Sequence, residues 1–236
     1  MTFVHRCLAA LAILVAVAGA AAQTSGSRTY APGPFDSLEV DGAAQVRLVQ
    51  GDRDQVVVIG DADVQRGVEV ELDRRRLVLH TAGAWKFWSK NKVQVEVQVR
   101  RLSQLTLSGA SDLHAPGTVR SERLAIGISG AGNVRFDDLN AGTLKFDISG
   151  AGDAQLAGQV GDLSLNVSGK GKVAAEQLRA TRADVSISGV GNAQLWVTER
   201  LNVSISGVGG IDYWGQPEVM RSTSGLGSVK SLGDKR

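Results

Sequence analysis

Stacked carboxylates are the first feature of this sequence that could do chemistry, because a motif with a variable, often acidic, last position recurs along the C-terminal half. One copy reads Ser149-Gly150-Ala151-Gly152-Asp153. Carboxylates stacked in this way could bind calcium, which needs several carboxylate or carbonyl oxygens. From copy to copy, however, the last residue runs Asp, Asn, Asp, Lys, Asn, Gly and Ser. Because Lys172 would repel a cation from the middle of the row, we expect a structural turn and no metal.

The motif also supplies one serine per copy, and a serine can act as a nucleophile when a base contacts it. No copy matches the Gly-x-Ser-x-Gly turn of hydrolases, since Gly127-Ile128-Ser129-Gly130 continues with Ala131. After the N-terminal segment the histidines are His80 and His114, and neither has a second His or a Cys at ligand spacing. We therefore predict no catalytic constellation and no cofactor, with the serines bonded to backbone groups or to one another.

A pair of carboxylates could hydrolyse a glycoside, and Asp137-Asp138 is the one adjacent acidic pair of the repeat region. The pair falls in an expected loop, where a solvated turn explains it better. A polysaccharide-acting β-helix enzyme is nevertheless kept as the alternative function, because such enzymes place clustered carboxylates on one face.

The most unusual stretch is Trp85-Lys86-Phe87-Trp88, which places two of the four tryptophans beside basic residues. Aromatic and basic groups together suit contact with a glycan, an anionic lipid surface or a partner protein. Trp85, Lys86, Phe87 and Trp88 are therefore the candidate binding residues. The interpretation that we favour is that the rings fold back as a plug of the N-terminal end. Trp196 and Trp214 are interpreted as packing residues.

These residues must be positioned by a repeat of about twenty residues. The copies begin, at spacings of 21, 20, 19, 20, 18 and 18, at Ser108, Ser129, Ser149, Ser168, Ser188, Ser206 and Ser224. Such a period is typical of a solenoid, in which each repeat packs on its neighbours. Short segments of alternating apolar residues precede the serines, which indicates strands. The glycines are expected to form a corner, through positive φ and through close approach of adjacent backbones.

The sequence thus predicts an all-β protein, a right-handed parallel β-helix or β-solenoid in which each coil adds a strand to two or three sheets. We expect coils of about 18–21 residues in the C-terminal half and longer coils with hairpins, one turning at 73–76, in the N-terminal half. Asp41-Gly42-Ala43-Ala44 is interpreted as a degenerate copy of the motif, which we call the worn copy. One interior ladder is expected to hold Leu107, Ile128, Ile148, Val167, Ile187 and Ile205.

The domain organisation follows from the same reading. Residues 1–22 are typical of a signal peptide, with an apolar run too short for a transmembrane helix. Residues 23–34 are expected to be a flexible leader, and 35–232 a single solenoid domain, irregular over 35–104 and regular over 105–232. Removing the signal with Arg6 lowers the formal net charge from +2 to +1. With interspersed charges, a nucleic-acid partner is not expected.

The iterated Ser-Gly-Ala-Gly-Asp/Asn motif, preceded by Phe35-Asp36-Ser37-Leu38-Glu39-Val40 and by Val97-Gln98-Val99-Arg100-Arg101-Leu102, resembles a bacterial family. That family is described as "putative auto-transporter adhesin, head GIN domain", and the resemblance covers about residues 35–217. It implies a fold similar to right-handed parallel β-helices. It transfers no catalytic residue.

The function expected from the sequence is that of a non-catalytic extracytoplasmic scaffold or recognition module, in an adhesive role. We expect export to the periplasm or the outer surface of a bacterium, with no membrane span in the mature chain. The expected partners are a cell-envelope glycan or protein. Self-association through the ends or edges of the solenoid stays open.

Overall fold

The protein is described by a computed structural model, which covers residues 26–81 and 93–235. The expected signal peptide and the aromatic segment 85–88 lie outside the described residues. The elements, in chain order, are β1 (Ser27–Tyr30), β2 (Ser37–Asp41), β3 (Ala44–Gln50), β4 (Gln55–Ile59), α1 (Ala62–Arg66), β5 (Val68–Asp73), β6 (Arg76–Thr81), β7 (Val93–Val99), β8 (Gln104–Leu107), β9 (Asp112–Ile128), β10 (Ala131–Ile148), β11 (Ala151–Val167), β12 (Lys170–Ile187), β13 (Val190–Ile205), β14 (Val208–Trp214), β15 (Glu218–Thr223) and β16 (Leu226–Ser231).

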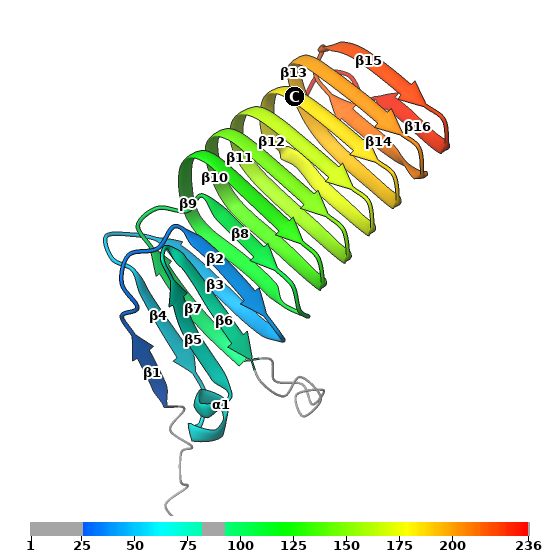
Figure 1. The fold of residues 1–236 in the computed structure, drawn as a ribbon. Coiled ribbons are helices and arrows are strands. Elements are labelled where there is room, and N and C mark those ends of the chain that lie inside the picture. Colours follow the sequence, from blue (N-terminus) through cyan, green and yellow to red (C-terminus); the bar gives the residue numbers. More distant parts are fainter. Residues whose placement is uncertain (1–25, 82–92, 236) are drawn as a thin grey trace, which may run out of the picture.

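The C-terminal half is a stack of parallel coils, which confirms the predicted β-solenoid (Figure 1). Each of the strands β9 to β13 forms almost a whole coil by itself and pairs in parallel with the next. All sixteen strands of the described chain join in one sheet, so the expectation of two or three separate sheets was wrong. The reason is that the strand turns through irregular pairing, as between Phe136 and Leu139, without leaving the ladder.

Apolar residues from successive coils meet in the interior. The predicted ladder is confirmed: Leu107, Ile128, Ile148, Val167, Ile187 and Ile205 are neighbours in register, and each is at most 1% exposed. Because side chains of a strand alternate between its two faces, the residues between them point to solvent. The ladder therefore fixes which residues form the outer faces of the solenoid.

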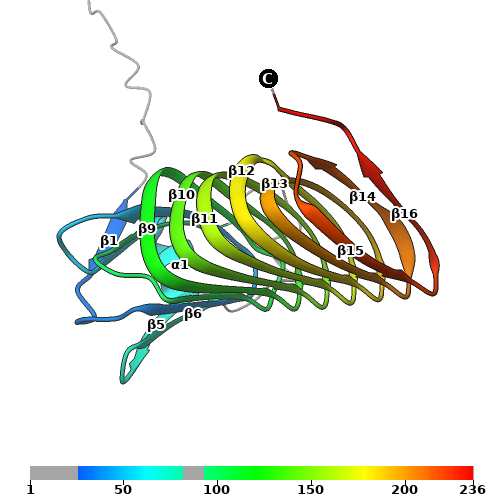
Figure 2. The same cartoon turned by 90° about the horizontal axis from the view of Figure 1, so that it is seen from above.

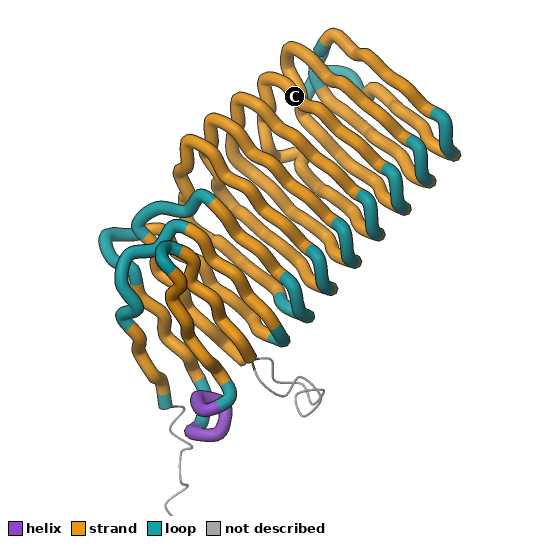
Figure 3. Tube along the Cα trace, in the orientation of Figure 1, coloured by secondary structure: helices purple, strands orange, loops and turns teal. Residues whose placement is uncertain are grey.

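The Ser-Gly pairs form the one corner that interrupts the strand in the coils of β9 to β13, and these corners line up along one edge of the stack (Figure 3). At Gly150 the nearest backbone atoms to an added Cβ would belong to Gly130 and Ser129, with the Ser129 oxygen at 2.5 Å. This confirms close approach as the reason for glycine. The expected positive φ was wrong, since the positive-φ glycines of the described chain are outside these Ser-Gly pairs. The pairs are needed because no Cβ fits between coils.

The worn copy of the motif is confirmed by its position below the first regular corner. An added Cβ on Gly109 would lie 2.5 Å from the carbonyl carbon of Gly42, and the Ala110 amide donates to the Gly42 oxygen at 2.7 Å. The strands β2 and β3 on either side of Gly42 pair in parallel with β8 and β9. Residues 37–50 therefore form a coil of the same plan.

The N-terminal end of the stack is closed by antiparallel strands, and the β5–β6 hairpin projects from it (Figure 2). β4 pairs antiparallel with β7, and β5 pairs antiparallel with β6 through the predicted turn, where Arg74 has a φ of 56°. Residues 27–30, expected in a flexible leader, instead form β1 on the free edge of β4. This strand forms because Tyr30 packs against the core and β1 pairs with the otherwise open edge of β4.

Candidate binding faces

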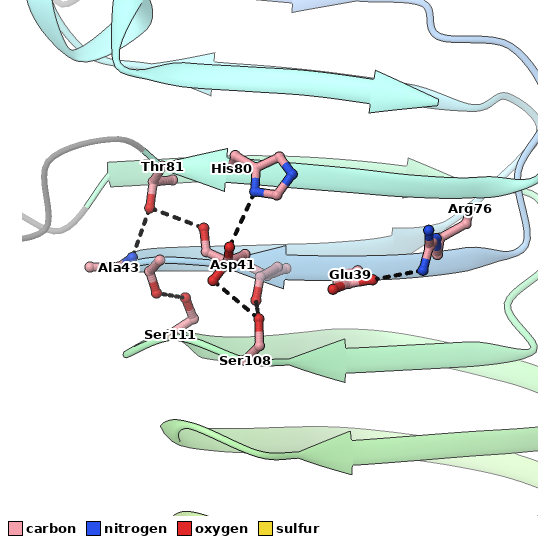
Figure 4. A network of polar contacts seen from close by, with 10 residues as sticks. Glu39, Asp41, Ala43, Arg76, His80, Thr81, Ser108 and Ser111 are labelled. Atoms are coloured by element: carbon pink, nitrogen blue, oxygen red, sulfur yellow. Dashed lines mark hydrogen bonds and ion pairs between the residues drawn. The ribbon is translucent and has the colours of Figure 1, made fainter. Parts of the chain in front are cut away.

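The corner of the worn copy carries a polar network, shown in Figure 4. His80 Nδ1 lies 3.2 Å from Asp41 Oδ2, and Ser108 Oγ lies 3.3 Å from Asp41 Oδ1. The carboxylate therefore stands between the serine and the imidazole. A nucleophilic serine would instead need the imidazole as its own partner. His80, Asp41 and Ser108 do not form a catalytic triad.

Two buried hydroxyl groups of this corner satisfy backbone groups. Ser111 Oγ accepts from the Ala44 amide at 3.0 Å and donates to the Gly42 oxygen at 2.9 Å. Thr81 Oγ1 accepts from the Ala43 amide at 2.7 Å. Ser111 occupies the place of the second motif glycine, and its side chain is fully buried. The bonds of Ser111 give a structural reason for serine in place of the second motif glycine, because they connect the irregular coil to the first regular one.

The acidic pair 137–138 belongs to a second polar cluster. Asp137 accepts from Arg135 Nε at 2.6 Å and contacts His114 Nε2 at 2.8 Å. The His114 bond, and then the Arg135 bond, hold the pKa of the Asp137 carboxyl below its usual value. Asp138 accepts instead from Thr118 Oγ1 at 2.6 Å. The two carboxylates thus have separate partners, and the lowered pKa of Asp137 is the opposite of what a general acid needs.

The acidic column of the motif has structural bonds as well. Asn133 donates from its side chain to Asp112 Oδ1 at 2.8 Å, and the Lys172 amide donates to Asp153 Oδ1 at 2.8 Å. Each carboxylate therefore bonds to the coil above it. Over residues 26–81 and 93–235, no three or more His, Cys, Asp or Glu side chains gather as metal ligands.

A different face carries free hydrogen-bonding groups, and we call it the serine–asparagine face. It consists of two rows of outward side chains on β11, β12, β13 and β15. One row is Ser164, Asp184, Asn202 and Met220, and the other is Asn166, Ser186, Ser204 and Ser222. Neighbours within a row are about 4.8 Å apart, and the rows are about 6.6 Å apart, because they follow strand spacing and alternation.

The serine–asparagine face is hollowed into a shallow groove of about 540 Å³, lined by both rows and by Arg221. The serine hydroxyls of the two rows make no side-chain hydrogen bond to any described residue. Asn202 Nδ2 donates to Asp184 Oδ1 at 2.6 Å, but Asn202 Oδ1 is buried without a partner in the described chain. Buried polar atoms normally have a partner. The groove therefore offers donors and acceptors to a ligand, but no nucleophile beside a base.

Comparisons with known proteins identify the family that has this fold. The model of the family described as "Putative auto-transporter adhesin, head GIN domain" matches residues 34–217. The chain belongs to this family. The comparison with curated proteins finds no match.

Several solved structures share the fold of this head GIN domain protein. A putative adhesin from Bacteroides fragilis is 22% identical, with a TM-score of 0.82 over 89% of this chain and 98% of that one. A putative lipid binding protein from Parabacteroides distasonis is 21% identical, with a TM-score of 0.69 over 89% and 98%. A putative adhesin from Parabacteroides merdae is 19% identical, with a TM-score of 0.67 over 88% and 95%. At these identities the likeness shows the fold alone.

Of the sequence-predicted site residues, Trp85, Lys86, Phe87 and Trp88 lie outside the described part of this head GIN domain protein, so they stay a prediction. The serine–asparagine face was missed. Its signal was present, since Ser186 and Ser204 alternate with buried residues and are 18 residues apart, which is one coil period. The same alternation that places their neighbours in the interior places Ser186 and Ser204 on the outer surface.

Proposed function

We propose that this head GIN domain protein is a non-catalytic, extracytoplasmic recognition module that binds a hydroxyl-rich glycan of the bacterial envelope along the serine–asparagine face. The observation that carries the proposal is the pair of in-register rows with free hydroxyl and amide groups over a shallow groove. An adhesive role would follow, because attachment to an envelope polymer needs a long binding face and no turnover. Family membership supports this role, since the family is named for adhesins.

The chemistry of the face favours a glycan over other ligands. Serine hydroxyls and asparagine amides both donate and accept, and so do sugar hydroxyls. A rigid sheet also holds these groups in place, which lowers the entropic cost of binding. No helix within the described ranges is long and apolar enough to cross a membrane. We propose export to the periplasm or cell surface, which protease accessibility on intact cells would test.

Retention of the purified protein on an insoluble cell-wall glycan fraction tests the proposal. Ser204→Leu should weaken retention, because it replaces a free hydroxyl in the groove with a bulky apolar group. Asn202→Leu should act in the same direction, because it removes the amide that holds the Asp184 carboxylate in the groove and puts an apolar side chain there. Each weak bond contributes about 0.5–1.5 kcal/mol, so the double variant should bind roughly tenfold or more weakly.

The matched control is Gln194→Leu, since Gln194 lies on the same strand but is not part of the groove. It should retain wild-type binding. Trp85→Ala with Trp88→Ala forms a separate arm, which tests the sequence-predicted aromatic residues. Equal retention of wild type and the Asn202→Leu/Ser204→Leu variant would refute the role of the face. Release of new reducing ends from the fraction would contradict a non-catalytic function.

A further inference from the structure

The last coils carry a lysine ammonium beside two tryptophan rings. Trp196 on β13 and Trp214 on β14 are partners in the ladder, so their side chains are neighbours across adjacent coils. Lys235 Nζ lies 4.9 Å from the centre of the Trp196 ring and 5.8 Å from that of Trp214. Both distances are within the range of cation–π attraction. The rings were expected to be packing residues, and the structure adds a cation to them.

The position of this lysine is set by the backbone before it. The Leu232 amide donates to the Tyr213 oxygen at 2.8 Å, and the Gly215 amide donates to the Gly233 oxygen at 2.9 Å. Gln216 Nε2 then donates to both carboxylate oxygens of Asp234, at 3.2 and 3.0 Å. The segment 232–235 is therefore held against β14, and its lysine reaches the rings from a fixed backbone.

In this position the Lys235 ammonium has no hydrogen-bond acceptor within residues 26–81 and 93–235. Lys235 Nζ is buried and has no hydrogen-bond partner among the described residues. Loss of hydration lowers the pKa of Lys235, and attraction by the Glu176 carboxylate offsets part of this effect. Glu176 Oε2 is also buried without a partner among those residues. The site thus supplies aromatic faces and the Glu176 carboxylate, with the Arg179 guanidinium 5.9 Å from the centre of the Trp196 ring. None of the three N–H bonds of Lys235 reaches an acceptor among the described residues.

We propose that Trp196, Trp214 and Glu176 form a binding site for a quaternary ammonium group, and that Lys235 occupies this site as an internal ligand. A quaternary ammonium carries its positive charge on methyl groups and has no N–H to satisfy. In this site it would keep the cation–π attraction and the attraction to Glu176. The absence of hydrogen-bond acceptors would cost it no free energy, because it has no N–H group. The site is separate from the serine–asparagine face, so this proposal stands apart from the proposed function.

Titration with tetramethylammonium tests the proposal. The full chain carries Trp85→Phe and Trp88→Phe, so that tryptophan fluorescence reports on Trp196 and Trp214. Removing the internal ligand with Lys235→Ala should strengthen binding about tenfold over the parent, because the probe no longer displaces a lysine. Adding Trp214→Phe should weaken binding again, since phenylalanine is the poorer cation–π partner. Glu176→Gln should weaken tetramethylammonium binding while both tryptophan rings stay unchanged.

Choline and its neutral carbon isostere, dimethylbutanol, separate charge from shape. Choline should bind the Lys235→Ala chain and dimethylbutanol should not. Equal binding of the two would overturn the proposal in favour of a simple apolar pocket. If tetramethylammonium does not bind, the proposed site is refuted, and Lys235 only holds the segment 232–235 against the rings. If Lys235→Ala unfolds the last coil, NMR of the wild type decides: saturating probe should shift the Lys235 side-chain signals to those of a solvated lysine, and unchanged signals would refute displacement.

Discussion

Replacing Gly169 by alanine would put a methyl carbon where the backbone of the neighbouring coil already lies. The added Cβ would stand 2.6 Å from the Ser149 oxygen and closer still to the Gly150 oxygen. Both obstacles are backbone, so no side-chain rotation relieves the overlap. The two coils must move apart at this corner.

The cost can be worked from the bonds that hold the corner closed. The Gly169 amide donates to the Ile148 oxygen at 3.1 Å, and the Lys170 amide donates to the Gly150 oxygen at 2.9 Å. Losing both bonds costs about 1–3 kcal/mol, and more if the freed groups stay buried. Overpacking adds about 1–3 kcal/mol. We therefore expect Gly169→Ala to lower the free energy of unfolding by about 2–6 kcal/mol.

Gly127→Ala is the matched control, because an added Cβ there meets no atom within 4 Å. Alanine also reduces the entropy of the unfolded chain, so this variant should be neutral or stabilised by up to about 1 kcal/mol. Urea unfolding followed by circular dichroism measures both. Since solenoids can unfold in parts, hydrogen exchange of the corner amides should accompany it. Equal stability of the two variants would refute close coil approach as the reason for these glycines.

Three further predictions concern the interior and the polar clusters. Ile148→Asp should cost several kcal/mol by burying an unpaired charge, whereas Ile148→Val should cost about 0.5–1.5 kcal/mol in the same urea experiment. Ser111→Ala should cost about 1–3 kcal/mol because it leaves the Ala44 amide without its partner, whereas Ser129→Ala, which removes only a 3.5 Å contact, should be nearly neutral in thermal unfolding. Because the pKa of Asp137 is lowered in the folded protein, its contribution to stability is present above about pH 4 and is lost as pH falls through that lowered value. Asp137→Asn should therefore reduce stability near neutral pH and leave it unchanged in strong acid; an equal loss at both pH values would contradict the assignment.

The regular half of the fold could be predicted because one motif encodes both its period and its corner. The interior ladder through Ile148 follows from alternation, and the level of each rung follows from the spacing of the serines. The inference of a positive φ was wrong. Glycine can serve either to adopt a positive φ or to let two backbones approach closely, and the sequence does not distinguish these two uses. Here the backbone of the coil below, such as Ser149 beneath Gly169, decides between them.

The rest depended on contacts between residues far apart in the chain. β1 forms because the edge of β4 needs a partner, and Ser27–Tyr30 have no strong strand pattern of their own. Trp196 and Trp214 are separated by 18 residues, one coil period, so their position as neighbours on adjacent coils was foreseeable. The position of Lys235 beside the two rings was not foreseeable, because it depends on how the segment 232–235 bonds to β14.

The continuous strand that makes each coil has a consequence for how such a protein can change over generations. Every outward residue has two coordinates, its coil and its row, and substitutions at those coordinates leave the interior ladder untouched. Inserting or deleting one whole coil would lengthen or shorten the solenoid by about 4.8 Å and keep every row aligned. The closed N-terminal end confines such additions to the regular part of the stack. The length of a binding face and its chemistry can therefore evolve independently of each other.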